Sequence, residues 1–173
     1  GTVMEAVVVR TAKETRRPPS AWEPSGVGEF KQTEKDPESG AAVRWSIREL
    51  TTTKELNAEG RAMHHCVRSY VANCRRGKVA VFSLQVALDE PRNSYDDDAG
   101  PRAPTRVMPI AVNARTRQIT QVRGRYNALP SGRFEAHQKK RGLDTVYRAC
   151  LRRSRSIVHE WAEVESLTWG SRI

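Results

Sequence analysis

Two short segments hold most of the side chains that could do chemistry. The first, residues 59–70 (EGRAMHHCVRSY), places two histidines, a cysteine and a tyrosine on a predicted helix. Adjacent helical residues such as His64 and His65 point about 100° apart, whereas Cys66 and Tyr70 lie one turn apart and can face the same pocket. This composition indicates an acid–base or nucleophilic site whose partner groups come from elsewhere in the fold. A buried, structural Cys66 beside a capping or exposed histidine is the alternative.

The second segment, residues 121–127 (QVRGRYN), is typical of a phosphate-binding strand end. Gln121, Arg123 and Arg125 alternate along a predicted strand and should therefore share one face. An amide and two guanidinium groups can grip a phosphate, and the following Tyr-Asn turn, which includes Asn127, can contact a base or a sugar. A solvent-facing sheet edge is the alternative interpretation.

Metal and cofactor sites are not expected. A metal site would use His65, Cys66 and Cys74, but no pair among them has the spacing of zinc ligands, and a fourth ligand is missing. No glycine-rich phosphate loop indicates a nucleotide cofactor. Three cysteines, an odd number without a CxxC pair, argue against a disulfide scaffold and favour the cytoplasm.

The positive charge is concentrated in one part of the chain. The net charge is +10, and the stretch from Ala114 to Arg155 holds twelve basic and two acidic residues, so it alone accounts for this surplus. Such clustering predicts a surface that binds phosphates, with nucleic acid (RNA or DNA) as the partner. A merely solvated surface is the alternative. No apolar run approaches the length of a membrane span, so no membrane contact is expected.

The predicted elements form one domain, residues 43–173. Residues 1–42 are rich in Pro and Gly, show no sustained period and are interpreted as an extension, an arm or a linker to other domains upstream of residue 1. A T-x-x-E capping box at Thr52 opens a short helix that Gly60 is expected to end, and a second helix is expected over 61–76, with Gly77 as its C′ residue. Strands are predicted over 42–48, 78–88, 106–114 and 118–124, with a polar loop between the second and third.

The chain beyond Pro130 is predicted to be helical to near its end. Its last helix has an apolar stripe interrupted only by Ser154: Leu143, Tyr147, Cys150, Ile157, Trp161 and Val164. Four cations share the other side and are assigned to phosphate contacts: Arg141, Arg148, Arg152 and Arg155. The whole predicts an α+β domain, with a small, mainly antiparallel sheet of about four strands packed against two short helices and a long C-terminal helical region.

The two segments together resemble the C-terminal domain of the PcfJ-like family, which occurs on conjugative plasmids, phages and related mobile genetic elements. The EGRAMHHCVRSY run, a VFSL strand and the QVRGRYN run stand in the family's order, and the similarity extends from about Trp45 to Asn127. The resemblance implies these site positions: His65, Cys66, Tyr70, Gln121, Arg123, Gly124 and Asn127. The chain departs from the family at Arg68, where glycine is frequent, and near 109–112, where many members carry a carboxylate on the middle strand.

Three functions remain open from the sequence. The first is a metal-independent enzyme acting on RNA or DNA phosphates, with His64 or His65 as base and Gln121 and Arg123 stabilising charge. The second is a nucleic-acid-binding module in which the same residues bind without turnover. The third is a transferase on a nucleotide-like cofactor, distantly similar to ADP-ribosyl transferases.

Overall fold

The protein forms a six-stranded sheet. The computed structural model describes residues 20–64, 67–88, 104–130 and 143–170. The strands are β1 (Phe30–Lys35), β2 (Ala42–Leu50), β3 (Val79–Leu88), β4 (Thr105–Asn113), β5 (Gln118–Val122) and β6 (Thr168–Trp169). Their order in the sheet is the order in the chain: β1 to β5 form an antiparallel meander, and β6 pairs with β5 in parallel.

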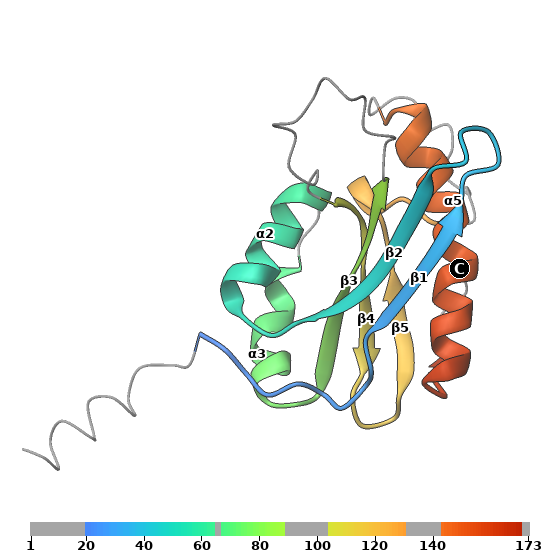
Figure 1. Cartoon of the computed structure of the whole chain (residues 1–173). Coiled ribbons are helices and arrows are strands. Elements are labelled where there is room, and N and C mark those ends of the chain that lie inside the picture. The colour runs from blue at the N-terminus through green and yellow to red at the C-terminus, as the bar shows by residue number, and fades with distance from the viewer. Residues whose placement is uncertain (1–19, 65–66, 89–103, 131–142, 171–173) are drawn as a thin grey trace, which may run out of the picture.

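Helices cover both faces of this sheet (Figure 1). One face carries α2 (Thr53–Met63) and α3 (Val71–Arg75), joined through the 3-10 turn η1 (Arg68–Tyr70). The opposite face carries the 20-residue helix α5 (Thr145–Val164), and a second 3-10 turn, η2 (Arg125–Asn127), follows β5. None of these described helices has the length and apolarity that crossing a membrane requires.

The α+β class is confirmed, with more strands than the four predicted. β1 lies within the segment expected to be an extension, because FKQTEK has no apolar alternation and pairs with β2 mainly through its backbone. β6 has two residues, too few for a detectable pattern, and it lies after the long helical region, where no strand was expected. The helical expectation for residues 131–142 lies outside the described residues, as does most of the predicted polar loop.

Residues before 43 take part in the sheet and in its packing. Val27 is buried in the main core, and the backbone N–H of Trp22 donates to the carbonyl of Thr51 at 2.9 Å. Residues 20–42 are therefore an integral part of the sheet and its packing, although their composition resembles that of a linker.

The main core lies between the sheet and α5. Alternate strand residues such as Ile47, Phe82 and Ile110 face α5, and burial of this surface is the dominant stabilising term. Phe82 meets Trp161 of α5 edge to face, with ring centroids 4.9 Å apart. The predicted stripe on this helix is right for Tyr147, Ile157 and Trp161, but the buried side also includes Leu151, Val158 and Ala162, and Cys150 is only half-buried. Ser154 is fully buried with its hydroxyl donating to the Leu151 carbonyl, whereas Val164, in the last turn, is 70% exposed.

A smaller core lies beneath α2 and α3 and contains Leu50, Leu56 and Val81. The capping box is confirmed, since Thr52 Oγ1 accepts from the Glu55 N–H at 3.1 Å. The predicted end of this helix at Gly60 is wrong, because continuing the helix to residue 63 buries Met63.

The second predicted helix, over 61–76, is correspondingly wrong. α2 ends at His64, which adopts the left-handed conformation, and only η1 and the five-residue α3 follow. Gly77, with φ +69°, ends α3 as expected.

Helix α5 is fixed to the sheet through Tyr147. Its hydroxyl donates to the Val107 carbonyl at 2.7 Å and accepts from the Arg125 N–H at 2.7 Å. Gly124 lies directly against this tyrosine, so that a Cβ there would come within 2.8 Å of Leu151 Cδ1 and nearer still to the Tyr147 hydroxyl. Glycine is therefore required at this position for steric reasons, although its φ of −82° is ordinary.

We expect Gly124→Ala to destabilise the protein by about 1–3 kcal/mol, the usual cost of overpacking. Urea unfolding measures this change. Without a clash, glycine-to-alanine replacement commonly stabilises a protein by about 0.4–1 kcal/mol through the unfolded state, so the sign is diagnostic. The same substitution in a Tyr147→Phe background should cost less, because the nearest contacting atom has been removed. A stabilising Gly124→Ala would contradict this packing.

Candidate functional site

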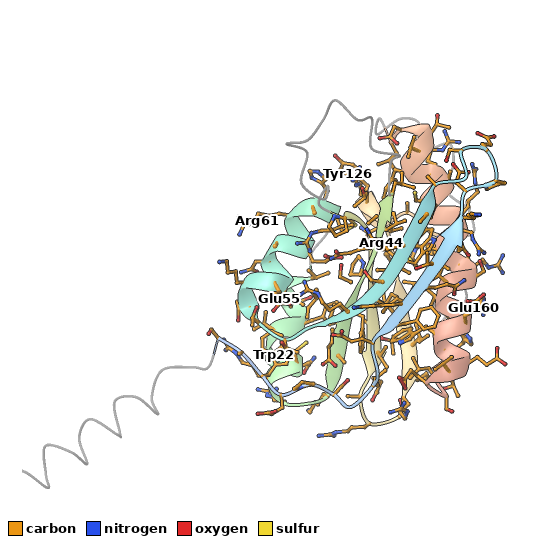
Figure 2. All side chains as sticks on the ribbon, viewed as in Figure 1. Trp22, Arg44, Glu55, Arg61, Tyr126 and Glu160 are labelled. Carbon is orange, nitrogen blue, oxygen red and sulfur yellow. The ribbon has the colours of Figure 1, made fainter. Side chains whose placement is uncertain are left out.

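Two side-chain contacts join the two sequence segments into one site. The Tyr70 hydroxyl donates to Gln121 Oε1, which links η1 to β5. The rings of His64 and Tyr126 stack with centroids 4.7 Å apart and an interplanar angle of 5°. Figure 2 shows Tyr126 at the end of the sheet, near the end of α2 that carries Arg61. Segments 51 residues apart in the chain are thus in contact.

Strand register places Gln121 on the side of the sheet that α2 and α3 cover. It pairs with Ala111, while its neighbour Val122 points into the main core. Because Oε1 accepts from Tyr70, the Nε2 donors of the Gln121 amide point elsewhere and its orientation is fixed. Burial, and secondarily the nearby Cys74, raises the pKa of Tyr70. Its phenol therefore remains protonated at neutral pH and acts as a donor that positions Gln121.

The backbone beside the ring pair is held in uncommon conformations. His64, Tyr126 and Asn127 all have positive φ, at 52°, 54° and 62°. Histidine and asparagine tolerate the left-handed region better than most residues, whereas for a bulky residue such as tyrosine it is an outlier. Hydrogen bonds from Asn127 N to the Gly124 carbonyl and from Gly124 N to the Ala128 carbonyl hold the turn. Strain of this kind is typical of functional sites.

The predicted alternation of Gln121, Arg123 and Arg125 on one face is wrong for Arg125. β5 ends at Val122, so the period of two stops there. Arg123 is half-buried just past the strand. The Arg125 guanidinium lies 4.3 Å from the centroid of the Tyr147 ring, on the α5 side. Arg125 thus contributes a cation–π contact to the docking of α5 and does not share the face of Gln121.

The other predicted site residues are only partly described. Asn127 is exposed at the end of η2, and His64 is exposed at the end of α2. His65 and Cys66 lie outside the described residues, so their predicted roles stay predictions. Among the described residues, no three His, Cys, Asp or Glu side chains gather to hold a metal ion.

A buried carboxylate lies close to this site. Glu59 of α2 is fully buried, and its Oε2 accepts from Ser83 Oγ at 2.9 Å and from Arg106 Nη1. Gln85 Nε2 donates to the same Ser83 hydroxyl at 3.0 Å. Within the described part of the chain, Oε1 of Glu59 has no hydrogen-bond partner. Burial raises the pKa of Glu59, and the bonds from Arg106 and Ser83 offset this only in part.

This polar cluster was missed from the sequence, although a signal was present. Glu59 lies between Leu56 and Met63 at spacings of three and four, in the buried stripe of α2. Ser83 and Gln85 likewise interrupt an otherwise apolar strand. The middle strand itself carries Pro109 at the position paired with Ser83. The carboxylate at this face of the sheet therefore comes from the facing helix and not from β4.

The cations of α5 lie away from the main core. Arg152 and Arg155 are exposed and Arg148 is half-buried. Arg141 lies outside the described residues. The neighbouring Arg153 pairs with Glu34 of β1.

Comparison with known families agrees with the motifs. The model described as PcfJ-like protein matches residues 31–136, which run from the second residue of β1 past η2 and include both site segments. The chain belongs to the PcfJ-like family. The expectation from the motifs is therefore confirmed. Searches of curated proteins and of solved structures gave no match.

A pH dependence of stability should follow from the buried Glu59. In the unfolded chain the carboxyl group of Glu59 has a pKa of about 4.3, and folding raises this pKa. Its contribution to the free energy of unfolding is therefore fully present below pH ~4.3 and is lost as the pH rises through the folded pKa. Glu59→Gln cannot ionise, so the stability of the variant relative to wild type should rise between pH 4 and 7 in urea unfolding experiments.

Glu49, whose pKa is also raised by burial, contributes in the same direction and remains in both proteins. Glu49→Gln is the matched control, because it should remove a separate component that adds to that of Glu59. A stability difference between Glu59→Gln and wild type that does not change with pH would show that Glu59 has no raised pKa.

Proposed function

We propose that this PcfJ-like protein is a metal-independent enzyme that acts on nucleic-acid phosphates at the site where α2, η1 and η2 meet. The convergence of the two motif segments, through the Tyr70–Gln121 hydrogen bond and the His64–Tyr126 ring pair, carries the proposal. The family's occurrence on conjugative plasmids and phages supports nucleic acid as the partner. The cysteine content favours the cytoplasm as the place of action.

Each group in this site has a chemical task. The Gln121 amide, oriented by Tyr70, and the Arg123 guanidinium donate to non-bridging phosphate oxygens, where charge develops. The exposed His64 imidazole accepts the proton of an attacking hydroxyl or water as the new oxygen–phosphorus bond forms. The same proton then passes to the leaving oxygen as its bond to phosphorus breaks. His65 and Cys66 are candidates for the base as well, since they follow His64 directly.

A non-catalytic binding module is the second candidate. In its favour, the Tyr70 hydroxyl and the Glu59 carboxylate are both engaged within the protein, by Gln121 and by Arg106. Groups held in this way can serve to present a rigid binding surface. Measurements of binding and turnover together separate the two functions.

We expect His64→Ala to lower turnover of labelled RNA or DNA by about 10²-fold or more, the usual contribution of a general base. Binding of the same oligonucleotides should change little. Tyr70→Phe, which only frees the Gln121 amide, should have a smaller effect on turnover. His159→Ala is the matched control, because His159 is an exposed histidine on α5 whose ring contacts Trp169 instead of the site. Binding without turnover in wild type would favour the module, and absence of both would refute the proposed function.

The exposed α5 arginines should add a sequence-independent contribution to binding. Like charges about one turn apart on a helix, such as Arg148, Arg152 and Arg155 of α5, repel, and a polyanion relieves this repulsion. Arg152→Gln with Arg155→Gln is the preferred double variant, since Arg148 is half-buried. If each arginine meets one phosphate, the slope of log K against log salt should become shallower by about 1.4–1.8. An unchanged slope would place the phosphate contacts elsewhere.

A further inference from the structure

Strand alternation sorts the charges of β1 onto the two faces of the sheet. Phe30, Gln32 and Glu34 face α5, where Glu34 pairs with Arg153. Lys31 and Lys35 therefore point to the opposite side, the side that carries α2, and both are exposed. A segment with little net charge thus presents cations on one face and a neutralised carboxylate on the other.

β2 repeats the same separation. Trp45 and Ile47 are buried toward α5, so Arg44 and Arg48 point to the α2 side. Glu49 turns back toward the segment before β1, where Ser25 donates to its carboxylate from both N and Oγ. Figure 2 shows Arg44 on β2, near the middle of the sheet. Two adjacent strands therefore expose their basic residues on a common surface.

The register arranges these four cations in a zigzag. Lys35 pairs with Ala42, Arg44 with Thr33, and Lys31 with Ser46, and Arg48 takes the next position on this face of β2. Successive same-face positions are about 6.6 Å apart along a strand, so the four charges span roughly 20 Å. We name the surface formed by Lys31, Lys35, Arg44 and Arg48 the basic sheet face. A row of cations at this spacing suits a polymer of phosphates better than a single small anion.

The basic sheet face borders the candidate site. The row of Lys31 and Ser46 continues across the sheet to Gln85 and then to Arg106, which pairs with Glu59. Because β1 and β5 run in the same direction, Lys35 lies at the same end of the sheet as η2.

β1 and β2 themselves place no carboxylate on this face. The other described carboxylates near it are Glu55, 3.9 Å from Arg48, the buried Glu59, which pairs with Arg106, Asp36 and Glu38 of the β1–β2 turn, and Glu29, which accepts from the Glu49 N–H. These carboxylates lie at the borders of the four cations and not between them on the two strands. Protection of an edge strand against aggregation would explain Lys31 and Lys35 on β1. It does not explain Arg44 and Arg48, because β2 is paired on both sides.

We infer that the basic sheet face is a docking surface for the phosphodiester backbone of a nucleic-acid strand, leading it toward the site near η2. This inference rests on the proposed function and names where that function's partner binds. The contacts are made to phosphates, so the surface holds the strand without reading its sequence.

The test is the salt dependence of binding, with the full chain, a labelled single-stranded oligonucleotide and a duplex of the same sequence. Lys31→Gln with Arg44→Gln should weaken binding and reduce the salt slope by about 1.4 for the single strand or about 1.8 for the duplex. The matched control is Arg76→Gln with Arg115→Gln, which removes the same charge from exposed positions. The backbone N–H of Ala114 donates to the carbonyl of Lys78, next to the start of β3 and the end of β4. Arg76 and Arg115 therefore lie near the end of the sheet opposite to Lys35, and both are exposed. The control should change the slope much less.

The outcomes separate this inference from the proposed function. Equal effects of the test and control variants, or no effect of the test variant while wild type still binds, would overturn the basic sheet face and leave the proposed function standing. A salt slope that decreases only in the Arg152→Gln, Arg155→Gln variant of α5 would likewise overturn the basic sheet face and leave the proposed function standing. Absence of binding to either oligonucleotide by wild type would overturn both. Unchanged thermal unfolding of the test variant confirms that its effect is on binding.

Discussion

The fit of the short turn Gly124–Asn127 between two helical layers is the constraint on which the rest of the arrangement depends. On one side Tyr147 of α5 accepts from the Arg125 N–H and lies under the Arg125 guanidinium. On the other side Tyr126 stacks on His64 at the end of α2. The turn therefore connects the main core to the site across the end of the sheet. Its positive φ values and the steric requirement for Gly124 are the consequences of this fit.

On the α2 side of the sheet, the helix–sheet interface contains a buried carboxylate, Glu59. A hydrophobic residue there would fill the helix–sheet interface without a desolvation cost, and replacing buried ion pairs by apolar groups is often neutral or stabilising. The Glu59–Arg106–Ser83 cluster therefore contributes less to stability than its number of bonds suggests. The cluster lies on the same face of the sheet as Gln121.

The two faces of the sheet have different tasks. The α5 face is apolar and holds the main core, whereas the α2 face carries at least one polar residue on each strand from β2 to β5 (Ser46, Ser83, Arg106 and Gln121) beside the smaller core. Only part of that polar face is covered by α2 and α3, which contact β4 and β3. A sheet of this type carries most of its buried apolar surface on one face and can carry polar groups on the other.

The sequence by itself determined the α+β class, the family, the capping box at Thr52, the four central strands and the stripe of α5, because each rests on local periodicity or a short motif. It also indicated that residues 59–70 and 121–127 belong together. Only the tertiary structure decided that Arg125 lies on the α5 side, that Glu59 is buried against Ser83 and Arg106, and that β1 and β6 complete the sheet. The physical reason is that these features depend on where a strand ends and on which elements meet across the sheet. Local sequence periodicity carries no information about either. The net charge of the chain outside residues 114–155 is zero, and this sum hides cations and carboxylates that strand alternation places on opposite faces of the sheet.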